Sequence, residues 1–265
     1  MLAALLLILP GCQQAPAGSA VDAATVVSLN PCTDAILSEI AAPGQLLAIS
    51  HYSQNKRSSS MPLDVAASYR TTGGSAEEVL ALAPDMVVAD VFLAPATRHA
   101  LEQAGIEIVT VGIPSSLDHS VGQIALLGEA TGNTARADAL VQEVTVAWDS
   151  HEWTGQPISA LLLQEGDIVA GQGSLAHALL IQAGFSSLSA ARGLGQGAHL
   201  PLEHVLAEPP QVVITAGGGR MQQHPALGAI PGMQHHLFDP TLLYCGGPTI
   251  PRALDRLTEI RRSAQ

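Results

Sequence analysis

Short apolar runs and amphipathic stretches alternate along this chain. Four apolar runs have the length of buried strands, at residues 25–29, 46–50, 86–89 and 106–111, and the first is rich in β-branched residues. Residues 96–104 have a helical pattern that ends at Gly105, a common helix stop. Because strands and helices alternate, this part of the chain predicts a mostly parallel sheet with helices on its faces.

One segment occurs twice. Residues 77–88, EEVLALAPDMVV, are echoed by residues 203–214, EHVLAEPPQVVI, with Glu, Val, Leu, Ala, Pro and Val at the same offsets. Each copy predicts a short helix, a proline stop and a buried strand. Two such copies indicate two similar lobes, and two lobes imply a cleft between them.

The middle of the chain carries no strand signal. Residues 117–130 predict one helix, and Asn133 can cap a second. The apolar positions of the second helix form one stripe, which consists of Ala137, Leu140, Val141, Val144 and Trp148. A helix of about twenty residues is roughly 30 Å long, which is enough to run along two lobes.

After residues 155–157 the α/β pattern resumes. It predicts a strand at 158–163, a helix at 174–183, a loop-like region at 217–233, a last strand at 237–244 and a closing helix that ends near Arg262. We therefore predict an α/β fold with two Rossmann-like lobes, whose mostly parallel sheets are joined by one long helix. The N-terminal lobe is expected at 26–114, the helical bridge at 115–154 and the C-terminal lobe at 155–265.

Two local features of the N-terminal lobe are also predicted. Asn30 and Pro31 end the first strand, and Thr33 or Asp34 is expected to cap the helix that follows. Residues 51–61 form a polar loop.

The charge balance excludes one class of partner. The 265 residues include 11 Lys and Arg and 23 Asp and Glu, for a formal net charge of −12, and Lys56 is the sole lysine. Nucleic-acid binding needs clustered basic residues, so we do not expect it.

The N-terminus predicts export. Residues 2–9 are apolar but too short to span a bilayer, and they lead into Leu-Pro-Gly-Cys at 9–12. This resembles a lipoprotein signal peptide at 1–12 with Cys12 as the lipidated residue, although no Lys or Arg precedes the apolar run. An ordinary signal peptide with an incidental cysteine is the alternative. Residues 13–25 predict a flexible tether.

Cys32 and Cys245 remain after Cys12 is set aside. Because strand ends line the ligand site of an open α/β sheet, both are expected on the cleft, on opposite lobes. Three interpretations stay open: a disulfide that clamps the lobes, a pair of soft metal ligands, or two small buried residues.

Several segments together resemble a known family. They are Val26–Asn30 before a polar helix start, the paired helix–proline–strand units, Gly171–Ser174 followed by Leu179, Leu180, Ala183 and Gly184, and Cys245–Pro248 before the last helix. In their order and spacing, over about residues 26–260, they are similar to periplasmic substrate-binding proteins of ABC importers that carry cobalamin, ferric siderophores or haem. The resemblance implies a metal-chelate ligand, an ABC permease with its ATPase as partner, no resident cofactor, no enzymatic activity and a monomer. It also implies limited hinge closure about the long helix.

The strand-end rule selects the candidate ligand-binding residues. They are Cys32, Thr33, His51, Tyr52, Phe92, Gly173, Ser174, Tyr244 and Cys245. The three aromatic rings can stack on a flat macrocycle or a catechol, and His51 can ligate iron or cobalt. Arg57, Arg192 and Arg220 are candidates to bind a ligand carboxylate.

Two other functions compete. Cys32 at a helix start, with His51 as base, could form the site of a thiol enzyme. A receptor for a free metal ion is the other, but the ten histidines are scattered and the adjacent His235 and His236 would point to opposite faces of a strand.

Glu77 and Glu203 occupy the same position in the two repeat copies. In the family that the chain resembles, one acidic residue on each lobe at this point docks on arginines of the permease. The resemblance implies that role here; a carboxylate favoured by the helix dipole is the simpler interpretation.

Overall fold

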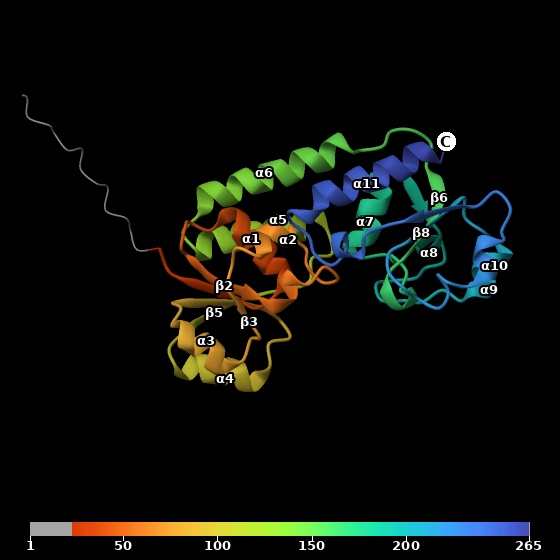
Figure 1. Ribbon diagram of the computed structural model, residues 1–265. Helices are drawn as coiled ribbons and strands as arrows, with labels where there is room; N and C mark the ends of the chain where they lie inside the picture. The colour runs from red at the N-terminus through yellow and green to blue at the C-terminus, as the bar shows by residue number, and fades with distance from the viewer. Residues whose placement is uncertain (1–22, 265) are drawn as a thin grey trace, which may run out of the picture.

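Two parallel β-sheets organise the chain, one in each lobe (Figure 1). The structure is a computed structural model that describes residues 23–264. The predicted signal peptide, Cys12 and most of the predicted tether lie outside these residues. Within residues 23–264, no helix is both long and apolar enough to cross a membrane.

The N-terminal lobe contains five strands in the order β3-β2-β1-β4-β5, with every neighbouring pair parallel. The strands are β1 (Val26–Ser28), β2 (Leu46–Ser50), β3 (Thr71–Thr72), β4 (Met86–Asp90) and β5 (Glu107–Val111). Helices α1 (Pro31–Ile40), α2 (Leu63–Ala66), α3 (Ala76–Leu82) and α4 (Pro95–Gln103) connect them, together with the 3-10 turn η1 (His51–Gln54). The central strands are buried on both faces, which explains their continuous apolar sequence.

The C-terminal lobe contains four parallel strands in the order β7-β6-β8-β9. They are β6 (Ile158–Leu163), β7 (Phe185–Ser187), β8 (Val212–Thr215) and β9 (Gln234–Leu237). The short helices are α7 (Leu175–Gln182), α8 (Leu188–Ala191), α9 (Leu202–Ala207) and α10 (Pro225–Gly228), with 3-10 turns η2 (Glu165–Asp167) and η3 (Pro240–Leu242).

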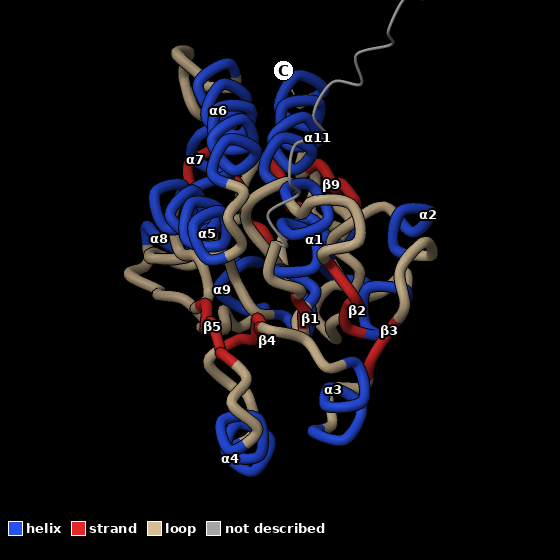
Figure 2. Tube along the Cα trace, turned by 90° about the vertical axis from the view of Figure 1, so that its left-hand side faces the viewer, coloured by secondary structure: helices blue, strands red, loops and turns tan. Residues whose placement is uncertain are grey.

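Helix α6 (Thr134–Ser150) joins the lobes after α5 (Leu117–Ala130). Its 17 residues span about 25 Å. It lies side by side with the closing helix α11 (Thr249–Ser263); α6 packs on α1 and α5, and α11 packs on α6 and α7 (Figures 1 and 2). One continuous hydrophobic core includes α1 and α5 of one lobe, α7 of the other, and α6 and α11. The apolar stripe predicted for the bridging helix faces this core through Ala137, Leu140 and Val144.

The segment after α6 is fastened to the C-terminal lobe by a buried cation–π contact. The Arg261 guanidinium lies 4.3 Å from the centre of the Trp153 ring. Arg261 also donates hydrogen bonds to the carbonyl oxygens of Gly184 and Gln156. Gly184 has φ +87°, and a Cβ there would lie 2.3 Å from Cγ of Trp153, so only glycine fits.

The predicted fold class is confirmed, but three local predictions were wrong. Asn30, rather than Thr33 or Asp34, caps α1: its side chain accepts a hydrogen bond from the Cys32 N–H, and Pro31 occupies the first turn. The last strand is Gln234–Leu237 and not 237–244. The region 217–233, expected to be a loop, includes the short helix α10.

Candidate functional site

A cleft between the lobes is formed by loops that follow the carboxyl ends of the strands. Three adjoining cavities make up this cleft. We call them the N-lobe cavity, of about 200 Å³, the C-lobe cavity, of about 230 Å³, and the outer cavity, of about 800 Å³. The N-lobe cavity is lined by Asn30, Cys32, Asp90, Phe92, Val111–Pro114 and Tyr244. The C-lobe cavity lies between Ile113 and Pro114 on one side and residues of the second lobe, including Gln164, Ser174 and Cys245, on the other.

Tyr244 lines all three cavities. Its side chain is 42% exposed, in the segment between η3 and α11. Partial burial raises the pKa of the Tyr244 phenol, and the nearby carboxylates of Glu165 and Asp239 raise it further. The phenol is therefore protonated at neutral pH, and it offers both a hydrogen bond and an aromatic face to a bound molecule.

Charges of opposite sign face each other across the outer cavity. Lys56 and Arg57 from the N-terminal lobe line one side, and Glu165 and Asp239 from the C-terminal lobe line the other. Glu165 also accepts a hydrogen bond from the Gly218 N–H, which fixes the loop after β8. The outer cavity can therefore receive a ligand with polar or charged substituents.

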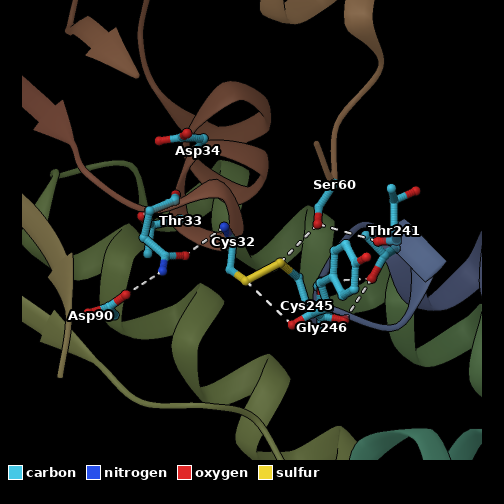
Figure 3. The surroundings of a disulfide bond; sticks show 12 residues. Cys32, Thr33, Asp34, Ser60, Asp90, Thr241, Cys245 and Gly246 are labelled. Atoms are coloured by element: carbon cyan, nitrogen blue, oxygen red, sulfur yellow. Dashed lines mark hydrogen bonds between the residues drawn. A yellow bond between two sulfur atoms is a disulfide. The ribbon is translucent and has the colours of Figure 1, made fainter. Parts of the chain in front are cut away.

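A disulfide joins the lobes beside Tyr244 (Figure 3). Cys32, in the first turn of α1, is bonded to Cys245, with an S–S distance of 2.05 Å and a Cα–Cα distance of 5.2 Å. Of the three interpretations of this pair, the structure therefore shows the disulfide, and the metal-ligand and unpaired alternatives were wrong. Both cysteines belong to the cleft wall, because Cys32 lines the N-lobe cavity and Cys245 the C-lobe cavity.

The turn that contains Cys245 packs closely on the N-terminal lobe. The Gly247 N–H donates to the Ser120 hydroxyl on α5, and Ser60 Oγ lies 3.0 Å from Cys245 Sγ. A Cβ on Gly246 would lie 2.3 Å from Ser120 Oγ, so this approach requires glycine. The turn is thus held by both the covalent bond and close packing.

Asp34 is a buried residue of α1 that stabilises the turn η1 in the N-terminal lobe. Its carboxyl group accepts hydrogen bonds from the Ser50 N–H and the Ser53 hydroxyl, and so it holds the turn η1 that carries His51 and Tyr52. The side chain is fully buried. Burial raises the pKa of Asp34 to about 8, against the opposing effect of its serine hydrogen bonds.

The structure brings together only part of the predicted ligand-binding set. Cys32, Phe92, Ser174, Tyr244 and Cys245 line the cleft cavities. His51 and Tyr52 are exposed on the same lobe, with ring centres 4.1 Å apart, but they line none of the three cavities.

Thr33 and Gly173, also in the predicted set, line none of the three cavities either. Thr33 is 1% exposed, and its hydroxyl donates to the Asn30 carbonyl and pairs with Ser28. Gly173, with φ +81°, shapes the turn before α7 and lines none of the cavities.

Of the three arginine candidates, Arg57 lines the outer cavity. Arg192 forms an ion pair with Glu208 at 2.8 Å, and Arg220 is exposed.

Sequence reasoning missed the wall formed by Ile113 and Pro114. These residues follow β5, and the strand-end rule applied to that strand would have selected them. It also missed Gln164 and Glu165, which follow β6. Lys56 had no comparable signal, because it lies within a polar loop rather than directly after a strand.

The two repeat carboxylates lie on separate lobes. Glu77 is exposed in the first turn of α3, and Glu203 is exposed in the first turn of α9. Both helices lie on the side of the molecule away from α6 (Figures 1 and 2). The neighbouring Glu78, by contrast, is used within its own lobe, where it accepts hydrogen bonds from Thr72 and the Gly73 N–H.

Among residues 23–264 we find no group of three or more His, Cys, Asp or Glu side chains arranged to hold a metal ion. The protein is defined instead by two α/β lobes, a helical bridge and a cleft of mixed polar and apolar lining. That combination is typical of bilobal solute-binding proteins.

The family model described as "Periplasmic binding protein" matches residues 26–236. The chain belongs to this family, as the sequence resemblance predicted. Members of this family are binding proteins and not enzymes, and the family implies a periplasmic location. The thiol-enzyme alternative was wrong for a second reason: the sulfur of Cys32 is bonded to that of Cys245.

Solved structures of the same class have a similar fold. The haem-binding protein RhuT from Roseiflexus sp. RS-1, in apo form, is 22% identical, with a TM-score of 0.70 over 92% of this chain and 100% of that one. The haem-binding protein HutB of Vibrio cholerae is 19% identical, with a TM-score of 0.74 over 90% and 98%. The vitamin B12-binding protein BtuF of Vibrio cholerae is 20% identical, with a TM-score of 0.66 over 92% and 98%. No curated protein sequence matches the chain.

Proposed function

We propose that this protein captures a metal-chelate ligand (haem, cobalamin or a ferric siderophore) in the cleft between its lobes and delivers it to an ABC permease. The observation that carries the proposal is the meeting of three cavities, lined from both lobes, at the Tyr244 ring. Ligand pockets commonly measure about 300–1,000 Å³, and the outer cavity lies in that range at about 800 Å³.

The lining fits a large, flat or chelated ligand. Tyr244 and Phe92 offer aromatic faces to the cleft, and Phe92 is 73% exposed. Lys56 and Arg57 offer cations to carboxylate substituents of such a ligand. Among the solved structures of similar fold, RhuT and HutB are named as haem-binding proteins and BtuF as a vitamin B12-binding protein, which supports this choice of ligand class.

The ligand class can be tested by thermal shift with haemin, cyanocobalamin and ferric siderophores, each compared with free Fe³⁺ and Zn²⁺. One chelate should raise the unfolding temperature in a concentration-dependent way, because it binds the folded state alone. Native mass spectrometry should show one such ligand per protein monomer. Stabilisation by a free ion and by no chelate would reject the proposal in favour of a metal-ion receptor.

We also propose that Cys12 carries the lipid anchor. The support is the Leu-Pro-Gly-Cys segment at 9–12, which follows an apolar run. Cys12→Ser should leave the protein in the soluble exported fraction or unprocessed, because the multiply acylated cysteine of a lipoprotein gives stable attachment. A mature N-terminus at any residue other than Cys12 would rule out this anchor.

A further inference from the structure

The lobes are covalently connected at two separate places. One is the chain itself, where residues 151–157 follow α6, and the other is the Cys32–Cys245 disulfide at the cleft. Two bodies joined at two points turn relative to each other about the line through both points. Parts near that line move little, whereas the rim of the cleft moves most.

Tyr244 lies directly beside the second connection. Cys245, the next residue, is bonded to α1 of the N-terminal lobe, and Gly247 donates to Ser120 on α5. On the other side, Asp239 caps the turn η3 by accepting from the Thr241 N–H and hydroxyl. The Ser60 hydroxyl of the N-terminal lobe donates to the Thr241 carbonyl, at 3.4 Å.

The disulfide also belongs to the cleft surface. Cys32 lines the N-lobe cavity and Cys245 lines the C-lobe cavity, and Tyr244 lines both. A disulfide that served only to stabilise an exported protein has no need to lie at this position. Here it sets the distance between α1 and the Tyr244 segment, and with it the width of the floor on which a ligand rests.

We propose that the Cys32–Cys245 disulfide is a positioning element of the ligand site, which fixes Tyr244 as a stationary floor while the outer rim of the cleft opens and closes. The ligand-binding part of this inference rests on the proposed function. The disulfide acts through Tyr244, so its loss changes ligand dissociation and not only the stability of the fold.

The first test needs no ligand. In a Cys12→Ser background, hydrogen exchange of the segment 241–248 is compared between the oxidised protein, the chemically reduced protein and Cys32→Ser/Cys245→Ser, under conditions where all remain folded. The inference predicts faster exchange in 241–248 after reduction, restored by reoxidation, with no change in α7 as an internal control. Unchanged exchange in 241–248 would overturn it.

The second test uses haemin and cyanocobalamin as probes, with dissociation followed by stopped flow. Reduction should raise the dissociation rate of the probe that binds by about tenfold. Tyr244→Ala should have a much smaller effect in the reduced protein than in the oxidised one, because both changes remove the same support. Tyr52→Ala is the matched control, and its effect should be the same in both states. Additive effects of reduction and Tyr244→Ala would overturn the inference. If neither probe binds the oxidised protein, those ligands are excluded from the proposed function and the exchange result alone decides the positioning role.

Discussion

Replacement of Asp34 by asparagine should change how the stability of the protein depends on pH. Asp34 is fully buried and holds the turn η1 under Tyr52. Burial raises its pKa from 3.8 to about 8 in the folded protein. An amide oxygen can accept the same hydrogen bonds from the Ser50 N–H and the Ser53 hydroxyl, but it never ionises.

The direction in which the free energy of unfolding changes with pH follows from proton linkage. Between about pH 4 and pH 8 the folded protein keeps a proton on Asp34 that the unfolded chain has lost. The stability contributed by this group is therefore fully present below pH 4 and is lost as the pH rises toward 8. The maximum slope for one proton is about 1.4 kcal/mol per pH unit. Asp34→Asn removes this slope, so its advantage over the wild type should grow steadily from pH 5 to pH 8.

Urea unfolding at pH 5, 6, 7 and 8, followed by the fluorescence of Trp148 and Trp153, measures the difference directly. All other titrating groups are common to both proteins, so their contributions cancel in the comparison. Asp34→Ala is the control: it also never ionises, but it removes the acceptor for both serine donors, so it should be less stable than Asp34→Asn at every pH, by about 1–3 kcal/mol. A stability difference between Asp34→Asn and the wild type that does not change with pH, or that falls as the pH rises, would refute the reasoning.

Three further predictions concern the disulfide, the Gly184–Trp153 contact, and the carboxylates of Glu77 and Glu203. Loss of the disulfide, which joins positions 213 residues apart, should lower the free energy of unfolding by about 5 kcal/mol on the chain-entropy model; calorimetry that shows no fall in the unfolding temperature would contradict this. Gly184→Ala should destabilise by roughly 3 kcal/mol or more, because its Cβ would meet Trp153. Gly44→Ala, also at positive φ but with open space around it, should lose only about 1–2 kcal/mol, and equal losses in urea unfolding would show that the Trp153 contact does not matter. Glu77→Ala and Glu203→Ala should reduce uptake in cells while ligand affinity stays unchanged, with the double variant worse and Glu129→Ala on α5 without effect; normal uptake by the double variant, or a loss of ligand affinity, would exclude docking through this pair.

The arrangement of lobes follows from patterns that are local in the sequence. The apolar runs that became β1, β2, β4, β6 and β8 are buried in central or near-central positions, where continuous apolar sequence is required. The stripe on α6 predicted its buried face for the same reason.

The misplaced last strand has a physical cause. Residues 237–244 include the apolar residues Phe238 and Leu242, which are buried and made the segment look like a strand. Asp239 and Pro240 instead start the 3-10 turn η3. The true strand, β9, is polar (Gln234, His235, His236) because it lies at the edge of the sheet and pairs only with β8.

The candidate site was harder to predict because it depends on how the lobes meet. The sequence placed Cys32 and Cys245 on opposite sides of a cleft, but the distance between them is a property of the assembled lobes. Tyr52 and Tyr244 both follow apolar segments, and only the structure shows that Tyr244 alone lies where the cavities meet.

The central claim is that a ligand binds between the lobes against Tyr244. Isothermal titration of the stabilising chelate into the wild type, Tyr244→Ala, Phe92→Ala and Tyr52→Ala tests it most directly, with Val146→Ala on the exposed face of α6 as control. The account predicts one site, a loss of about 1–3 kcal/mol for Tyr244→Ala, and no change for Val146→Ala. Unchanged affinity in Tyr244→Ala would contradict it.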